Sequence, residues 1–126
     1  FHGEGIQHMA LTTENIYQTV DLMRQQGVVF MDVPDTYYEA IDKRLPGHGE
    51  SISQLQQGAI LIDGTTDSVP PKLLLQIFTM PMLGPVFFEV IQRKGDEGFG
   101  EGNFQALFEA IERDQIRRGV LPNQKE

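Results

Sequence analysis

The feature that most constrains this chain is a pair of apolar segments, each of which contains one residue able to bind a metal ion. In the first segment, residues 5–11, alternation places His8 on one face with two apolar neighbours, which predicts a strand. In the second, residues 86–95, Glu89 stands between Val-Phe-Phe and Val-Ile. A charge in such a run must be paired, metal-bound or facing a cavity, because burying it alone is costly. An imidazole and a carboxylate far apart in the sequence therefore suggest an iron site.

Each of these residues also has a simpler interpretation. A strand histidine such as His8 is more often a core residue satisfied by a neighbour than a metal ligand. Glu89 could form a salt bridge with Arg93 if it faced solvent. Together they supply two of the three ligands of a two-histidine, one-carboxylate Fe(II) site. The third ligand is not evident, because we expect His2, near the start, and His48, between two glycines in a loop, to face solvent.

The composition limits the class of protein. The 126 residues suit one domain, and 18 acidic against 10 basic residues give a net charge of -8, which argues against nucleic acid as a partner. No apolar stretch approaches the ~20 residues needed to span a bilayer, so we expect no membrane association. The absence of cysteine excludes thiolate sites and fits a cytoplasmic enzyme. The chain begins with Phe1 and shows no leader pattern, so we expect a piece of a longer protein.

Periodicity and turn residues predict an α+β fold with a mostly antiparallel sheet. The first strand should lead into a helix capped by Thr12-Thr13-Glu14 and ended by Gly27. The final helix should be capped by Asn103 and should place Phe104, Leu107, Phe108 and Ile111 on one face. Between them we expect strands at 28–31, 60–64, 72–79 and 86–92, a helix over 34–45 and a helical turn at 51–57.

Five segments, in order, resemble the 4-hydroxyphenylpyruvate dioxygenase family. They are GEGIQH at 3–8, PDTYY at 34–38, LLLQIFT at 73–79, FFEVIQR at 87–93 and GFGEGNF at 98–104. The resemblance covers essentially the whole chain but only the last third or so of such an enzyme. It implies a vicinal-oxygen-chelate (glyoxalase/bleomycin-resistance-like) fold with a curved sheet. Residues 1–126 would form one βαβββ module plus a C-terminal helix, the second half of a catalytic domain whose upstream modules are absent.

The resemblance also implies the site. Fe(II) would be bound by His8, by Glu89 and by a histidine of the missing preceding module. The pocket for a small aromatic 2-oxo acid would contain Gln7, Gln76, Phe78, Phe87, Phe99, Asn103 and Phe104. By spacing alone, the aromatic residues could equally be plain core and Gln76 an ordinary edge-strand amide. The terminal helix would cover the mouth of the site above a Gly-rich hinge at 98–102.

The implied reaction joins 4-hydroxyphenylpyruvate and O2 to give homogentisate and CO2, a step of tyrosine and phenylalanine catabolism. Two alternatives remain. One is a hydroxymandelate synthase-like dioxygenase, which would use the same ligands and substrate to oxidise the benzylic carbon. The other is a non-catalytic fragment that binds metal weakly or not at all, because one ligand is missing. Such a fragment would self-associate through exposed sheet, so that we expect a homo-oligomer.

Overall fold

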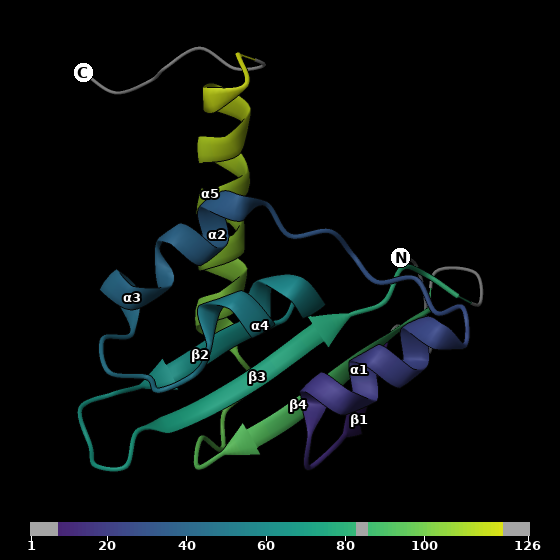
Figure 1. Ribbon diagram of the computed structural model, residues 1–126, viewed down its shortest axis with the longest axis horizontal. Helices are drawn as coiled ribbons and strands as arrows, with labels where there is room; N and C mark the ends of the chain where they lie inside the picture. Colours follow the sequence, from purple (N-terminus) through teal and green to yellow (C-terminus); the bar gives the residue numbers. More distant parts are fainter. Residues whose placement is uncertain (1–7, 83–85, 120–126) are drawn as a thin grey trace, which may run out of the picture.

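The computed structural model describes residues 8–82 and 86–119 as a four-stranded sheet with five helices (Figure 1). The sheet order is β1-β4-β3-β2, with β1 parallel to β4 and the other two pairs antiparallel. The predicted α+β class, the βαβββ strand order and the mostly antiparallel sheet are therefore confirmed. The elements are β1 His8–Thr12, α1 Ile16–Gln25, α2 Asp35–Glu39, α3 Ile41–Arg44, α4 Ile52–Gly58, β2 Leu61–Thr65, β3 Lys72–Phe78, β4 Phe87–Lys94 and α5 Glu101–Arg117.

One face of the sheet carries the hydrophobic core. Leu73, Leu75 and Ile77 alternate along β3 and are buried in this core with Val90 of β4 and residues of α1 and α4. Gln92, on the same face of β4, fixes the start of α1: its Oε1 accepts from the Ile16 N–H at 2.9 Å and its Nε2 donates to the Glu14 carbonyl at 2.7 Å. The helical layer is thus attached to a central strand at a helix terminus, where backbone groups need partners.

The opposite face carries the predicted site residues. Strand alternation places Gln76 and Phe78 on this face of β3, and the register pairs Phe78 with Glu89 of β4. The start of α5 lies against the same face, because the Gly100 backbone approaches the Gln76 side chain. From there α5 runs away from the sheet and packs against α2 (Figure 1). The site face is therefore partly covered by the N-terminal turn of α5.

Three local predictions in the first half of the chain are wrong. The N-cap of α1 is Asn15, whose side chain accepts from the Gln18 N–H, and not Thr12 to Glu14. Residues 28–31 form only one bridge, Phe30 to Thr79, because they meet β3 at its end. The helix expected over 34–45 is divided at Ala40 into α2 and α3, each of which is about one turn long.

The last helix also differs from its prediction. It begins at Glu101 after Gly100, whose φ of 77° marks the N-cap, so Asn103 lies inside the first turn. Its predicted apolar face is only partly right: Leu107 packs against the core, but Phe108 is 70% exposed, whereas Ala110 is buried. The small alanine lets α2 approach closely, and the Thr36 hydroxyl donates to the Ala110 carbonyl at 2.6 Å. None of the helices within residues 8–82 and 86–119 is long and apolar enough to cross a membrane.

Candidate functional site

Glu89 is the centre of the candidate site. It lies in β4, between β1 and β3, and only 7% of its surface is exposed. Its Oε2 accepts a hydrogen bond of 2.5 Å from Nε2 of Gln76, on the neighbouring strand. A carboxylate in a central strand needs such partners, because desolvation penalises the charged form. The prediction that Glu89 occupies a buried position in a central strand is therefore confirmed, and its side chain does not face solvent.

The register of the two parallel strands relates the second predicted ligand to Glu89. His8 pairs with Phe87, and Ala10 pairs with Glu89. Paired positions share a face, and residues two apart along a strand also share it, so strand position 8 belongs to the same face as position 89. The side chains of His8 and Phe104, and the whole of Gln7, lie outside what the structure describes. The backbone thus places the two positions together, while ligation by His8 stays a prediction.

No group of three or more histidine or acidic side chains that could hold a metal ion exists within the described residues. The expectation that His48 faces solvent is wrong, because the residue is only 6% exposed. Its Nδ1 accepts from the Glu50 N–H, and its Nε2 lies 2.9 Å from the Asp42 carboxylate. His48 is therefore a structural residue of the loop after α3. His2 lies outside the described residues.

Two of the predicted pocket aromatics lie beside Glu89. Phe78 is the register partner of Glu89, and Phe87 precedes it by two positions on the same face. Their rings form an edge-to-face pair with centroids 6.1 Å apart, and both side chains are half-buried. Phe99 is 71% exposed, and the Arg93 guanidinium lies 5.5 Å from the centre of its ring. The structure therefore brings Phe78 and Phe87 to the carboxylate and leaves Phe99 largely open.

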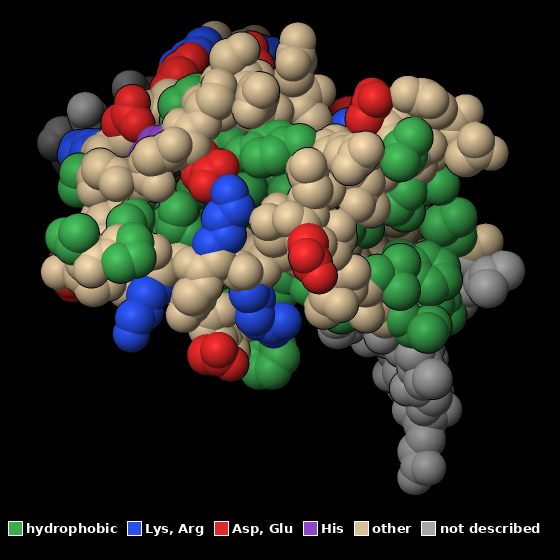
Figure 2. Space-filling model, turned by 60° about the horizontal axis from the view of Figure 1, so that its bottom comes forward, with side chains coloured by type: hydrophobic (Ala, Val, Ile, Leu, Met, Phe, Trp, Pro, Cys, Tyr) green, Lys and Arg blue, Asp and Glu red, His purple; other side chains and the backbone are tan. Residues whose placement is uncertain are grey.

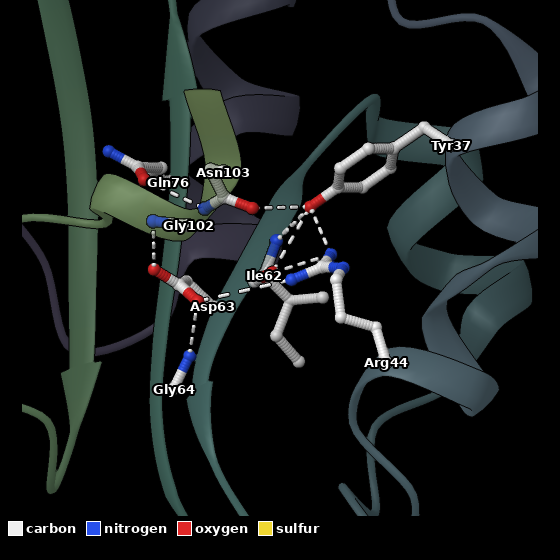
Figure 3. A network of polar contacts seen from close by, with 8 residues as sticks. All are labelled: Tyr37, Arg44, Ile62, Asp63, Gly64, Gln76, Gly102 and Asn103. Atoms are coloured by element: carbon white, nitrogen blue, oxygen red, sulfur yellow. Dashed lines mark hydrogen bonds and ion pairs between the residues drawn. The ribbon is translucent and has the colours of Figure 1, made fainter. Parts of the chain in front are cut away.

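Two of the three predicted amides, Gln76 and Asn103, take part in a buried polar network (Figure 3). Gln76 and Asn103 are at most 1% exposed, and Nδ2 of Asn103 donates to Oε1 of Gln76 at 2.7 Å. Oδ1 of Asn103 accepts from the hydroxyl of Tyr37 at 2.5 Å. That hydroxyl in turn accepts from Nη2 of Arg44 and from the Ile62 N–H. A continuous line of hydrogen bonds therefore runs from Arg44 to Glu89.

Sequence reasoning missed Tyr37 and Arg44. Tyr37 counts as core by its helical spacing, and burial does raise the pKa of its phenol to about 12 although the nearby Arg44 guanidinium lowers it. The only signal in the sequence was that a buried tyrosine hydroxyl needs a partner. Nothing in the local pattern indicates that this partner is Asn103, in a helix at the other end of the chain.

Asp63 of β2 fixes the start of α5 to the sheet. Its Oδ2 accepts from the Gly102 N–H and its Oδ1 from the Gly64 N–H, both at 2.8 Å, and Arg44 Nη1 lies 3.9 Å away (Figure 3). A carboxylate at a helix N-terminus is favourable because the first N–H groups of the helix lack backbone partners. A Cβ at position 102 would lie 2.6 Å from Oδ1 of Asp63, so a side chain there would displace this carboxylate.

Figure 2 shows a patch of apolar side chains at the right of the view, with further apolar side chains at the left and centre, among scattered charged side chains. Exposed large apolar residues include Val29 and Met31, and also Met80 and Met82 in a segment that is hydrogen-bonded to the first. Exposed patches of this kind commonly mark interaction surfaces. The expected self-association is compatible with this surface and stays a prediction.

Curated proteins match nearly the whole length of this chain, although no protein-family model matches it. It is 68% identical over 123 residues to 4-hydroxyphenylpyruvate dioxygenase of Legionella pneumophila (strain Corby), covering 96% of this chain and 34% of the relative. It is 62% identical over 123 residues to Hemolysin VllY of Vibrio vulnificus, covering 98% of this chain and 34% of that protein. The chain thus spans about a third of the length of the curated relatives it matches.

A solved structure supports the fold. A mutant of 4-hydroxymandelate synthase from Streptomyces coelicolor matches with a TM-score of 0.68 at 34% identity, over 88% of this chain and 31% of that chain. The predicted vicinal-oxygen-chelate fold is confirmed by this similarity, together with the strand order. The resemblance inferred from the five sequence segments is confirmed as well.

Proposed function

We propose that this chain, a homologue of the 4-hydroxyphenylpyruvate dioxygenases over nearly its whole length, is the C-terminal third of such an enzyme. Residues 1–126 would form one βαβββ module and the terminal helix, the second half of the catalytic domain. The other modules would lie in the part of the protein outside this sequence. The observation that carries the proposal is Glu89, a buried carboxylate in a central strand, held by Gln76 on the face that also includes position 8.

The whole protein would convert 4-hydroxyphenylpyruvate and O2 to homogentisate and CO2 in tyrosine and phenylalanine catabolism in the cytoplasm. The donor set fits Fe(II), because one imidazole and one carboxylate on adjacent strands need only a second imidazole to complete a two-histidine, one-carboxylate site. His8 and Glu89 would hold the ion from this chain. Fe(II) bound in this way would supply the activation of O2 and the binding of the 2-oxo acid.

The remaining residues would shape the pocket. Phe78 and Phe87 offer apolar ring surface beside Glu89, which suits an aromatic substrate and limits the access of water. Phe99 is exposed enough to be covered by substrate or by the rest of the protein. The other proposed pocket residues are Gln7, Gln76, Asn103 and Phe104. Gln76 and Asn103 would act mainly by holding the carboxylate and the start of α5, because both amides are already engaged.

The test is product analysis with the full-length protein, reconstituted with Fe(II) and supplied with 4-hydroxyphenylpyruvate and O2. We expect homogentisate, and we expect Glu89→Gln to reduce its formation to background because a neutral amide replaces the proposed anionic ligand. The matched control is Glu97→Gln, which removes an exposed carboxylate from the segment between β4 and α5. An active Glu89→Gln enzyme would contradict the proposal.

Two other outcomes are informative. The similarity to 4-hydroxymandelate synthase makes 4-hydroxymandelate the main alternative product, and chromatography of the same reaction distinguishes the two acids. The isolated 126-residue chain should form no product and should bind Fe(II) weakly, because we expect one ligand to come from another module. Turnover by the isolated chain would show that it is self-sufficient.

A further inference from the structure

We propose that Tyr37 and Arg44 are positioning residues for Glu89, which act through Asn103 and Gln76 by fixing the direction of the hydrogen bonds between them. This inference rests on the proposed function, because it concerns the carboxylate that would bind Fe(II). None of the five sequence segments includes Arg44, and Tyr37 stands in the segment at 34–38 with no role assigned to it. The network is drawn in Figure 3 apart from Glu89.

The donor-to-acceptor direction of these hydrogen bonds is set at the Arg44 end of the network. The Ile62 N–H donates to the Tyr37 oxygen at 2.8 Å, and Nη2 of Arg44 donates to it at 3.0 Å. Both groups can only donate, so they occupy the acceptor sites of the hydroxyl. The single hydroxyl hydrogen then points to Oδ1 of Asn103, 2.5 Å away, rather than to the more distant Ile62 carbonyl at 3.1 Å. That carbonyl is satisfied instead by Nη2 of Arg44.

The orientation of both amides follows. Once Oδ1 of Asn103 accepts from Tyr37, its Nδ2 must face Gln76, where it meets Oε1 at 2.7 Å. The Nε2 group of Gln76 is then the end that faces Glu89. Every bond in the line donates towards the carboxylate, which as an ion accepts only. Successive hydrogen bonds with one polarity strengthen one another, so the cation at one end supports the anion at the other.

Burial makes this orientation matter. Tyr37, Gln76 and Asn103 are at most 1% exposed, so water cannot readily replace a lost partner. Burial also raises the pKa of Tyr37 to about 12, so the hydroxyl keeps its proton even at pH values well above neutral. Without that hydroxyl, Asn103 could turn its amide over, and Gln76 would then present Oε1 to the Glu89 carboxylate. Oε1 of Gln76 and the Glu89 carboxylate both accept hydrogen bonds only, so they would repel each other and the carboxylate would be displaced.

The experiment compares Tyr37→Phe with Tyr38→Phe in the full-length protein. Tyr38 is the neighbouring residue of α2, is 4% exposed and donates its hydroxyl to the Ile60 carbonyl at 3.1 Å, outside the network. Both variants lose one buried hydroxyl, so a general loss of stability affects both. The measurements are anaerobic Fe(II) titration, which gives affinity independently of turnover, and the rate of homogentisate formation.

We expect Tyr37→Phe to weaken Fe(II) binding about 10-fold, the lower end of the effect usual for a group that orients a metal ligand, and Tyr38→Phe to change it less than about twofold. Unchanged affinity in Tyr37→Phe, or equal losses in the two variants, would overturn the inference. A wild-type protein that neither binds Fe(II) nor forms homogentisate would instead refute the proposed function itself, so the two failures are distinguishable.

Two further variants test the polarity of the hydrogen bonds in the network and the contribution of the Arg44 guanidinium at its cationic end. Asn103→Asp keeps the shape and the acceptor for Tyr37 but cannot donate to Gln76, so it should favour the reversed Gln76 amide and weaken Fe(II) binding more than Tyr37→Phe does. Arg44→Met keeps the apolar stem and removes the guanidinium, and we expect a smaller loss than for Tyr37→Phe. Wild-type affinity in a folded Asn103→Asp protein would show that polarity is irrelevant.

Discussion

Replacement of Gly100 by alanine should disturb the site through Gln76 rather than through the backbone alone. Gly100 has a φ of 77°, and a Cβ added there would overlap the side-chain amide of Gln76. The variant therefore combines two costs, a left-handed conformation in an L-residue and the displacement of a buried amide. Gly47 provides a matched control, because its φ is 78° and a Cβ there would have no atom within 4 Å.

The magnitudes follow from the bonds involved. A left-handed conformation costs an L-residue roughly 1–2 kcal/mol, and this cost should be common to Gly100→Ala and Gly47→Ala. Gln76 makes one hydrogen bond to a carboxylate and one to an amide. Such bonds contribute about 1.5–3 and 0.5–1.5 kcal/mol respectively, so Gly100→Ala should cost about 2–4.5 kcal/mol more than the control.

Urea-induced unfolding of the full-length protein, followed by circular dichroism, measures the difference between the two variants. We expect Gly100→Ala to shift the midpoint clearly further than Gly47→Ala and also to weaken Fe(II) binding. If the two variants lose the same free energy within about 0.5 kcal/mol, Gln76 can relax without loss and the close approach of α5 has no energetic role.

Three smaller perturbations probe other parts of the structure. Asn15→Ala removes the N-cap of α1 and should cost about 1 kcal/mol of unfolding free energy, whereas Thr12→Ala should cost less if the cap is Asn15. Gln92→Leu leaves the Ile16 N–H without its side-chain acceptor and should lower stability by about 1–3 kcal/mol, which thermal unfolding can measure. Because burial raises the pKa of Tyr37 to about 12, above the unfolded value of about 10, its contribution to stability should be complete below pH 10 and be lost as pH rises through 12. The difference in tyrosinate absorbance between wild type and Tyr37→Phe follows this titration, and ionisation of Tyr37 near pH 10 in the folded protein would contradict it.

The strands of the sheet were predictable because their signal is local, unlike residues 28–31, which form only one bridge. Apolar runs bounded by turn residues identified β3 and β4 to within two residues, and the buried charge of Glu89 followed from its apolar neighbours. The helical insert was less predictable. Its elements are four to seven residues long, and helices this short depend on packing rather than on propensity.

The errors at α5 and at His48 both come from contacts that periodicity does not show, which are distant in sequence for α5 and lie within a few residues for His48. An apolar stripe that includes Phe108 suggests a core face, but α2 packs instead on the side of Ala110, where the backbones can approach. Asn103 has the composition of an N-cap, yet its partners Gln76 and Tyr37 lie far away in sequence. His48 is buried because Asp42 and the Glu50 N–H satisfy its ring, a geometry that no local pattern encodes.

The parallel pairing of β1 with β4 sets an order on the assembly of this domain. The first strand has β4 as its sheet neighbour, so positions 8 and 89 meet only after β4 has been synthesised. A nascent polypeptide that ends before Phe87 can build the β2–β3 hairpin but has no partner strand for β1. Closing the long loop between β1 and β4 is entropically costly. The pairing of β1 with β4 is therefore the step that brings positions 8 and 89 to one face of the sheet.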